Sequence, residues 1–164
     1  MNSKRLIVTL TGGGFRWEAE SLIGGLGADF EYHYVTHGDS RSKPKPGLPD
    51  GPIHLIKKIT TMSEKGFLRQ SANFLRSFRD AWVVINRVKP DAIICVGTSA
   101  AVALCLCGKL KGIRTIYIES ITRISKASLT GRLLSVFRLC DRHYVQWPEA
   151  TRLYRRAIYR GTVL

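Results

Sequence analysis

The residue in this sequence whose type and position best suit a catalytic or ligand-binding role is Glu119. It directly follows the run Ile116-Tyr117-Ile118 and precedes Ser120 and Arg123. Such a run predicts a buried strand, and in open α/β sheets ligands bind at the carboxyl ends of the strands. A carboxylate there can accept a proton from an attacking hydroxyl group, and a guanidinium group can hold a phosphate. An ion pair between Glu119 and Arg123 that only pins the loop would explain the same residues.

A run of three glycines, Gly12, Gly13 and Gly14, follows a strand expected at 6–10. Glycine accepts positive φ and has no side chain, so this backbone can approach a phosphate or a sugar closely. The run is not a dinucleotide fingerprint, because Trp17 occupies the place of the third glycine. A turn that serves only the strand-to-helix geometry is the alternative.

Gly97, Thr98 and Ser99 occupy the same position after a strand expected at 92–96. Either hydroxyl group could bind a ligand or cap the following helix, and capping alone is the commoner role of Ser and Thr at such a place. The two turns and Glu119 are therefore expected at one edge of the sheet.

The histidines and cysteines lack the spacing of a metal or catalytic site. The sequence has no Cys-x-x-Cys pair, no His/Cys spacing suited to zinc and no Gly-x-Ser-x-Gly elbow. We therefore expect no metal and no cofactor, histidines in packing or surface roles, and free thiols in a reducing cytosol. The residues are His33, His37, His54 and His143, with Cys95, Cys105, Cys107 and Cys140.

The elements that must position these residues follow from an alternation of short β-branched runs with helical patterns. This alternation predicts an α/β fold with a Rossmann-like parallel sheet and crossover helices. Without an internal repeat or a second domain, residues 1–164 are expected to form a single domain. Strands are expected at 6–10, 30–36, 53–59, 92–96, 115–119 and 144–146, and helices at 18–26, 63–88, 130–139 and 149–158, with another from the 97–99 turn through Lys111.

Two segments depart from this regular pattern. Three prolines among Lys and Ser predict a mobile surface loop over about 38–52. Residues 63–88 carry aromatic and aliphatic side chains on one helical face and arginines mostly on the other. This basic amphipathic segment could lie on an anionic membrane surface or pack its apolar stripe into the core.

The charge of the chain predicts a polyanionic partner. Its 164 residues include 26 Lys and Arg against 12 acidic residues, a formal net charge of +14. Nucleic acid and anionic lipid both suit such a surface. Since no run of about 18 apolar residues is present, contact with a membrane is expected to be peripheral.

Five segments in order resemble a known family. It comprises the acceptor-side, membrane-associating subunit of the two-subunit UDP-N-acetylglucosamine transferase of asparagine-linked glycosylation, and bacterial exopolysaccharide proteins of the PssD type. The ordered combination of Ile-Glu-Ser-x-x-Arg, Ser-Leu-Thr-Gly and Val-Gln-Trp is far more specific than a lone glycine loop. The segments are 12–18, 89–100, 115–123, 128–131 and 144–148.

The resemblance implies the N-terminal half of a split GT-B glycosyltransferase related to MurG, acting on a lipid-linked glycan. The family's usual histidine after the paired glycines is Phe15 here, so a base at that position does not carry over, whereas Glu18 matches the family's downstream acid. Together with the residues above, this predicts Glu119 and Glu18 as catalytic residues. Acceptor or phosphate binding is predicted for Gly12, Gly13, Gly14, Gly97, Thr98, Ser99, Ser120 and Arg123.

The partners implied are a second subunit that binds the UDP-sugar, the lipid-linked acceptor and an anionic membrane surface, with no nucleic acid. The transfer would be of the N-acetylglucosaminyl or glucuronosyl type, at the inner face of the cytoplasmic membrane. A bacterial-type member is expected, because the membrane helix of the eukaryotic members is not seen. The rival hypothesis is a non-catalytic nucleotide- or nucleic-acid-binding α/β module, favoured by the charge although no such motif is evident.

Overall fold

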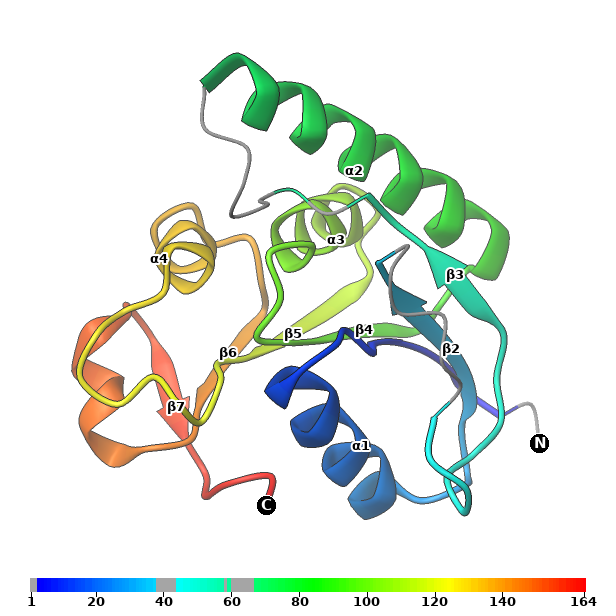
Figure 1. Ribbon diagram of the computed structural model, residues 1–164, viewed down its shortest axis with the longest axis horizontal. Helices are drawn as coiled ribbons and strands as arrows, with labels where there is room; N and C mark the ends of the chain where they lie inside the picture. The colour runs from blue at the N-terminus through cyan, green and yellow to red at the C-terminus, as the bar shows by residue number, and fades with distance from the viewer. Residues whose placement is uncertain (1–2, 38–43, 58, 60–66) are drawn as a thin grey trace.

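The computed structural model describes residues 3–37, 44–57, 59 and 67–164, and within them seven strands form one parallel sheet (Figure 1). Its order is β3-β2-β1-β4-β5-β6-β7, and each neighbouring pair is parallel. The predicted Rossmann-like α/β fold is thereby confirmed. The strands are β1 Arg5–Thr9, β2 Glu31–Thr36, β3 Ile53–Leu55, β4 Ala92–Val96, β5 Arg114–Ile118, β6 Arg142–Val145 and β7 Ala157–Tyr159.

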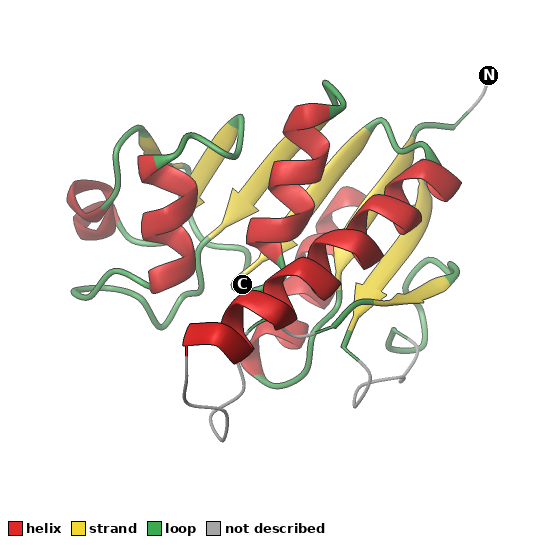
Figure 2. Cartoon of the chain, turned by 90° about the horizontal axis from the view of Figure 1, so that it is seen from above, coloured by secondary structure: helices red, strands yellow, loops and turns green. Residues whose placement is uncertain are grey.

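Helices cover both faces of this sheet. α2, α3 and α4 lie on one face and α1 lies on the other, as the two perpendicular views show (Figures 1 and 2). Their bounds are α1 Gly14–Leu26, α2 Phe67–Val88, α3 Ala101–Leu110 and α4 Leu129–Val136. No helix among the residues that the structure describes is long and apolar enough to cross a bilayer.

The core divides between the two faces of the sheet. Ile93 packs in the cluster under α2 and α3, while its neighbour Ile94 packs on the α1 side with Val8 and Ile23. Successive residues of a strand point to opposite faces, so a strand buried on both sides reads as a continuous apolar run. This is why the apolar run before Gly97 correctly predicted the strand β4.

The apolar stripe of the amphipathic segment faces the core. Ala81, Ile85 and Val88 are buried against the sheet, and Phe74 and Phe78 pack partly against the same cluster. Residues 63–66 and the side chains of residues 67–69 lie outside the described part of the chain. The stripe is therefore occupied, and any membrane contact of α2 must use its outward side.

The predicted closing helix at 149–158 is wrong. The chain forms a 3₁₀ helix at Pro148–Leu153, becomes extended at Tyr154 and then pairs as β7 with β6. Tyr154 is buried, and Arg156 has a left-handed φ of 61° that ends any helix there. Burial of the tyrosine and backbone pairing with β6 override the helical pattern of the sequence.

Other boundaries shift by up to four residues. α1 begins at Gly14 instead of residue 18, β3 ends at Leu55 instead of residue 59, and α4 ends three residues early. Of the predicted mobile loop, residues 38–43 lie outside the described residues. The following stretch is tied to β2, because the Tyr34 hydroxyl donates to the Pro49 carbonyl oxygen at 2.7 Å.

Candidate functional site

The candidate site lies along the carboxyl edge of the sheet, where loops from five strands lie in spatial order. His37 follows β2, the glycine turn follows β1, Gly97 and Thr98 follow β4, Glu119 follows β5 and Gln146 follows β6. The predicted site residues thus share one edge of the sheet. They divide into a buried carboxylate network and an exposed turn.

Glu119 is buried, with 2% of its surface exposed, and both of its carboxylate oxygens are hydrogen-bonded. Oε2 accepts from the hydroxyl groups of Ser128 at 2.5 Å and Tyr154 at 2.6 Å. Oε1 accepts from the Tyr117 hydroxyl and the Ser120 amide, both at 3.1 Å. All four partners are donors, so the surroundings hold a carboxylate in place and tie β5 to α4 and to the segment before β7.

The start of α4 is shaped to fit this carboxylate. Ser128 is the N-cap residue, and its hydroxyl accepts from the Gly131 amide at 2.9 Å while donating to Glu119. A Cβ atom at Gly131 would overlap Glu119 Oε2 and the Tyr154 ring. The Ser-Leu-Thr-Gly motif is therefore explained by one hydroxyl cap and one close approach.

Glu18 forms the second half of the network. It is 1% exposed, and it accepts from the Ser120 hydroxyl at 2.8 Å, the Ile121 amide at 3.1 Å and the Gln146 amide group at 2.6 Å. Gln146 also donates to the Glu119 backbone carbonyl at 3.0 Å. The two acids predicted to be catalytic are thus linked through neighbouring residues, and both serve as acceptors between elements far apart in the chain.

The glycine turn remains exposed above this network. Gly12, Gly13 and Gly14 are exposed, Gly13 has a φ of 74°, and α1 begins without a side-chain cap or an acidic residue in its first turn. The Thr11 hydroxyl beside the turn is buried and has no hydrogen-bond partner among the described residues. Free amide groups at a helix N-terminus attract anions, so this turn is suited to a phosphate.

Gly97 allows the turns after β1 and β4 to meet. Its φ is 57°, and a Cβ atom there would overlap the ring of Phe15, which lies against the turn. Thr98 is buried; its hydroxyl oxygen accepts from the Ala100 amide at 3.4 Å, whereas α3 has Ala100 as N-cap with no side-chain cap. Ser99 is half-buried in the same turn.

His37 is a candidate functional residue that the sequence reasoning assigned to packing or surface roles. Its Nε2 lies 3.3 Å from Thr98 Oγ1, and its Nδ1 lies 3.2 Å from the Ile56 carbonyl oxygen. The ring is half-buried at the carboxyl edge. The available signal was position, because the residue directly follows a predicted strand.

Arg123 and Glu119 do not pair. Arg123 is exposed, its backbone amide donates to the Ser120 carbonyl at 2.9 Å, and no ion pair joins it to Glu119 in the described structure. The loop is held instead by Trp147, whose indole N–H donates to the Ile121 carbonyl oxygen at 2.6 Å. The guanidinium group therefore stays accessible to a ligand.

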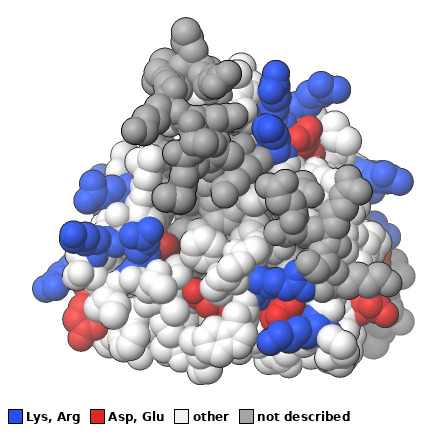
Figure 3. Space-filling model, in the orientation of Figure 1, with Lys and Arg blue, Asp and Glu red and all other residues white. Residues whose placement is uncertain are grey.

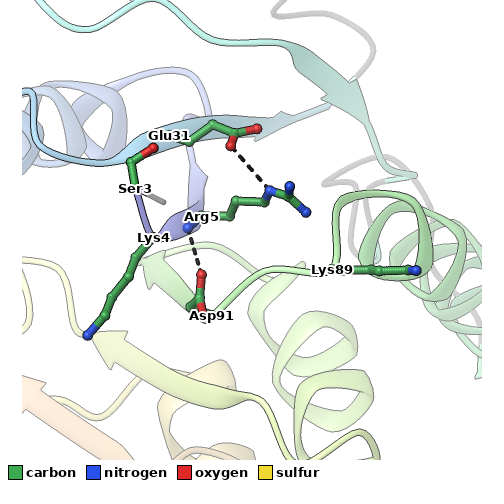
Figure 4. A pocket seen from close by; sticks show the side chains of 6 residues that line it. All are labelled: Ser3, Lys4, Arg5, Glu31, Lys89 and Asp91. Carbon is green, nitrogen blue, oxygen red and sulfur yellow. Dashed lines mark hydrogen bonds and ion pairs between the residues drawn. The ribbon is translucent and has the colours of Figure 1, made fainter. Parts of the chain in front are cut away.

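A pocket of about 450 Å³ opens at the opposite, amino edge of the sheet (Figure 4). There Arg5 pairs with Glu31 at 3.2 Å, and the Arg5 amide donates to Asp91 at 2.8 Å. Since Arg5 and Glu31 already pair with each other and the pocket lies away from the glycine turn, we do not place the site there. Nor do the described residues include a group of three or more His, Cys, Asp or Glu that could hold a metal ion.

The class of protein follows from the fold and this edge: the chain is a Rossmann-like half of the GT-B type. It superimposes on MurG of Acinetobacter baumannii with a TM-score of 0.68 at 17% identity, over 98% of this chain and 46% of that one. UDP-N-acetylglucosamine 2-epimerase of Rickettsia bellii gives a TM-score of 0.65 at 12% identity, over 99% and 46%. The chain therefore spans about half the length of these solved structures.

Residues 6–163 match the family described as oligosaccharide biosynthesis protein Alg14 like, and the chain belongs to this family. The UDP-N-acetylglucosamine transferase subunit alg14 of Schizosaccharomyces pombe is 29% identical over 178 residues, covering 98% of this chain and 83% of that protein. The family predicted from the ordered motifs is confirmed. The nucleic-acid-binding alternative is not favoured, while the likeness to PssD-type proteins stays a prediction.

Proposed function

We propose that this chain is the acceptor-side half of a UDP-sugar-dependent glycosyltransferase that acts on a lipid-linked glycan. The observation that carries the proposal is that residues 6–163 match the Alg14-like family, of which the Schizosaccharomyces pombe relative is called a UDP-N-acetylglucosamine transferase subunit. The superposition of 98% of the chain on 46% of MurG agrees with this proposal. A second polypeptide would supply the other half and the UDP-sugar site. The sugar transferred would be N-acetylglucosamine or glucuronic acid.

The glycine turn is the proposed site for the phosphate groups of the acceptor. The exposed N-terminus of α1 offers unpaired amide groups, and the buried Thr11 hydroxyl beside it lacks a partner within the described residues. Arg123 comes from the neighbouring loop after β5, which Glu18 binds to α1. Amide groups and a guanidinium group together favour a phosphate over a neutral ligand.

The proposed catalytic roles follow from the hydrogen bonds at this edge. Glu18 and Glu119 accept three and four hydrogen bonds respectively, which supports positioning roles for both. His37, half-buried at the same edge and in contact with Thr98, is the proposed general base on this chain. An imidazole can take the proton of an attacking sugar hydroxyl near neutral pH.

Transfer assays test whether glycosyl transfer requires both this chain and a second chain that binds the UDP-sugar. Labelled UDP-N-acetylglucosamine and UDP-glucuronic acid would be incubated with lipid-linked acceptor and with this chain alone, the partner alone or both. We expect turnover only when both chains are present. Robust turnover by the purified chain alone would refute the proposal.

Peripheral contact with an anionic membrane is supported by the outward side of α2. Leu75 and Val83 are 65% and 56% exposed, Arg76 and Arg79 lie beside them, and the Lys111 ammonium group sits 4.0 Å from the centre of the Trp82 ring. Basic side chains are visible over α2 in Figure 3. Each basic residue near an anionic surface contributes about 1 kcal/mol, so several give reversible, salt-sensitive binding.

Vesicle sedimentation tests this surface. Arg76→Gln combined with Arg79→Gln should weaken binding to anionic vesicles, by about tenfold or more if each residue contributes about 1 kcal/mol. The matched control is Lys4→Gln with Arg114→Gln, which removes the same charge from the exposed amino edge. Equal weakening by both pairs, or equal binding to neutral vesicles, would exclude α2 as the membrane surface.

A further inference from the structure

A small cavity lies beneath the end of α4, at the amino end of β6 and thus at the edge opposite the glycine turn. Its volume is about 70 Å³. Its charged and titratable lining consists of Arg138, Arg155, Arg156, Asp141, His143 and the thiol of Cys140. We call it the arginine cavity. Basic side chains gather over α4 and the segment before β7 on the left of Figure 3.

His143 leaves two buried polar atoms of this cavity without hydrogen-bond partners in the described part of the chain. The residue is only 4% exposed and lines the cavity, yet neither ring nitrogen has a hydrogen-bond partner among the described residues. Its ring packs between Tyr117 and Tyr154, with centroids 5.0 and 4.6 Å away. A buried polar group without a partner is destabilising, and a ligand that accepts its N–H would remove that cost.

The charge of the lining favours an anion. The lining includes three arginines and a single carboxylate, that of Asp141, and none of the three arginines is ion-paired within the described residues. Asp141 Oδ2 is already bound by the Thr115 amide at 2.7 Å and the Thr115 hydroxyl at 3.1 Å. Burial lowers the pKa of His143 to about 4, so near neutral pH its ring donates one hydrogen bond without adding charge.

The size of the cavity restricts the anion. Pockets for drug-sized ligands measure roughly 300–1,000 Å³, so a sugar ring or a nucleotide does not fit in about 70 Å³. That volume corresponds to about two water molecules at roughly 30 Å³ each, which suits one terminal phosphate head. Guanidinium groups match the geometry of phosphate oxygens, and a terminal phosphate presents three of them.

We propose that the arginine cavity binds a terminal phosphate group, either as inorganic phosphate or as the phosphomonoester headgroup of a lipid. Val136 and Phe137, which directly precede Arg138, are 61% and 62% exposed. An apolar pair beside a phosphate site is the arrangement that a headgroup at a bilayer surface requires. Both sources share the same chemistry and differ in what lies beyond the phosphate.

Titration calorimetry with inorganic phosphate, and sedimentation with phosphatidylcholine vesicles containing phosphatidic acid, test the proposal on the whole chain. Arg155→Gln with Arg156→Gln should weaken phosphate binding by at least about tenfold, since each loses a charge-assisted hydrogen bond. The control, Arg132→Gln with Arg152→Gln, removes the same charge from exposed residues that do not line the cavity. It should change the affinity by less than about twofold, because isolated surface charges contribute little.

The vesicle arm distinguishes the two sources. Binding of phosphatidic acid vesicles in preference to phosphatidylglycerol vesicles of equal surface charge identifies a lipid phosphomonoester, whereas calorimetric binding without that preference identifies inorganic phosphate. In either case, phosphate should raise the pKa of His143 in a histidine NMR titration, because a nearby anion favours the protonated ring. Absence of both kinds of binding in the unmodified chain, or equal losses in the two variant pairs, would overturn the proposal.

Discussion

The carboxylate of Glu18 and the side-chain amide of Gln146 meet at 2.6 Å, although 128 positions separate them in the chain. Both residues are nearly inaccessible to solvent. Their contact fastens α1 to the end of β6 across the carboxyl edge of the sheet. The loop after β5 is held between them, because Ser120 and Ile121 also donate to Glu18.

Replacing Glu18 by Ala should lower the free energy of unfolding by about 3 kcal/mol. Three buried donors would lose their acceptor, and an unsatisfied buried group costs about 1–3 kcal/mol before relaxation. Urea unfolding followed by circular dichroism measures the loss. Glu149→Ala, which removes an exposed carboxylate, serves as control; equal unfolding midpoints for the two variants would contradict the structural role of Glu18.

Glu119→Gln separates positioning from catalysis. The amide group would face donors on every side, so we expect a loss of about 1–3 kcal/mol in stability. In the reconstituted complex at a temperature where the variant is folded, we expect turnover within about tenfold of normal, since the proposed base lies elsewhere. A variant of normal stability with turnover lowered by about two to four orders of magnitude would instead support Glu119 as the base.

His37→Gln should lower turnover by about two to four orders of magnitude, because the amide keeps a hydrogen-bonding group but cannot accept the proton. His33→Gln is the matched control, since that histidine lies within β2 and contacts His54 away from the edge. Steady-state kinetics of the two-chain complex measure the effect. Near-normal turnover of a folded His37→Gln complex would show that the base is not His37 and lies at Glu119 or on the partner chain.

Gly97→Ala should destabilise the fold more than Gly112→Ala. Both glycines have positive φ, 57° and 66°, but only at Gly97 would the added Cβ atom meet the Phe15 ring. We expect an additional loss of about 1–3 kcal/mol, the usual cost of overpacking. Phe15→Ala in the same chain should recover most of that difference in thermal unfolding, and a failure to recover it would exclude the ring contact as the cause.

The stability of the protein should fall as the pH is lowered from about 6.5 to about 4. Burial depresses the pKa of His143 to about 4, below the 6.5 of an exposed histidine, so the unfolded chain binds an extra proton in this range. The full contribution is present above pH 6.5 and amounts to about 3 kcal/mol. His143→Phe should flatten this part of the profile in urea melts at stepped pH, and an unchanged slope would refute the assignment.

The order of strands and helices could be predicted because the periodicity of apolar residues and the residue types within each segment are local properties of the sequence. The consecutive apolar residues Ile93 and Ile94 predict a strand that is buried on both faces, and this prediction does not depend on which strands pair with it. The end of the chain could not be predicted in this way. Its helical pattern gives way because Tyr154 is buried beside Glu119 and the residues after it pair with β6.

The position of Glu119 at a strand end could also be predicted, but the roles of its neighbours could not. Ser128 and Tyr154 follow it by 9 and 35 positions, and only the packing of α4 and of the segment before β7 brings their hydroxyl groups to its carboxylate. His37 was missed for the same reason. Its position after a predicted strand is a local signal, but its contact with Thr98 joins loops 61 positions apart.

The placement of β1 in the middle of the sheet has a consequence for synthesis of the chain. Leu6 pairs with Tyr32 on one side but with Ala92 on the other, which is 86 positions further along. At about 5–20 residues per second, a ribosome needs on the order of 4–17 s to make that stretch, and until then one edge of β1 has no partner. The nascent chain therefore carries an open, apolar strand edge for seconds, a period in which chaperones can bind it and in which it is most prone to aggregate.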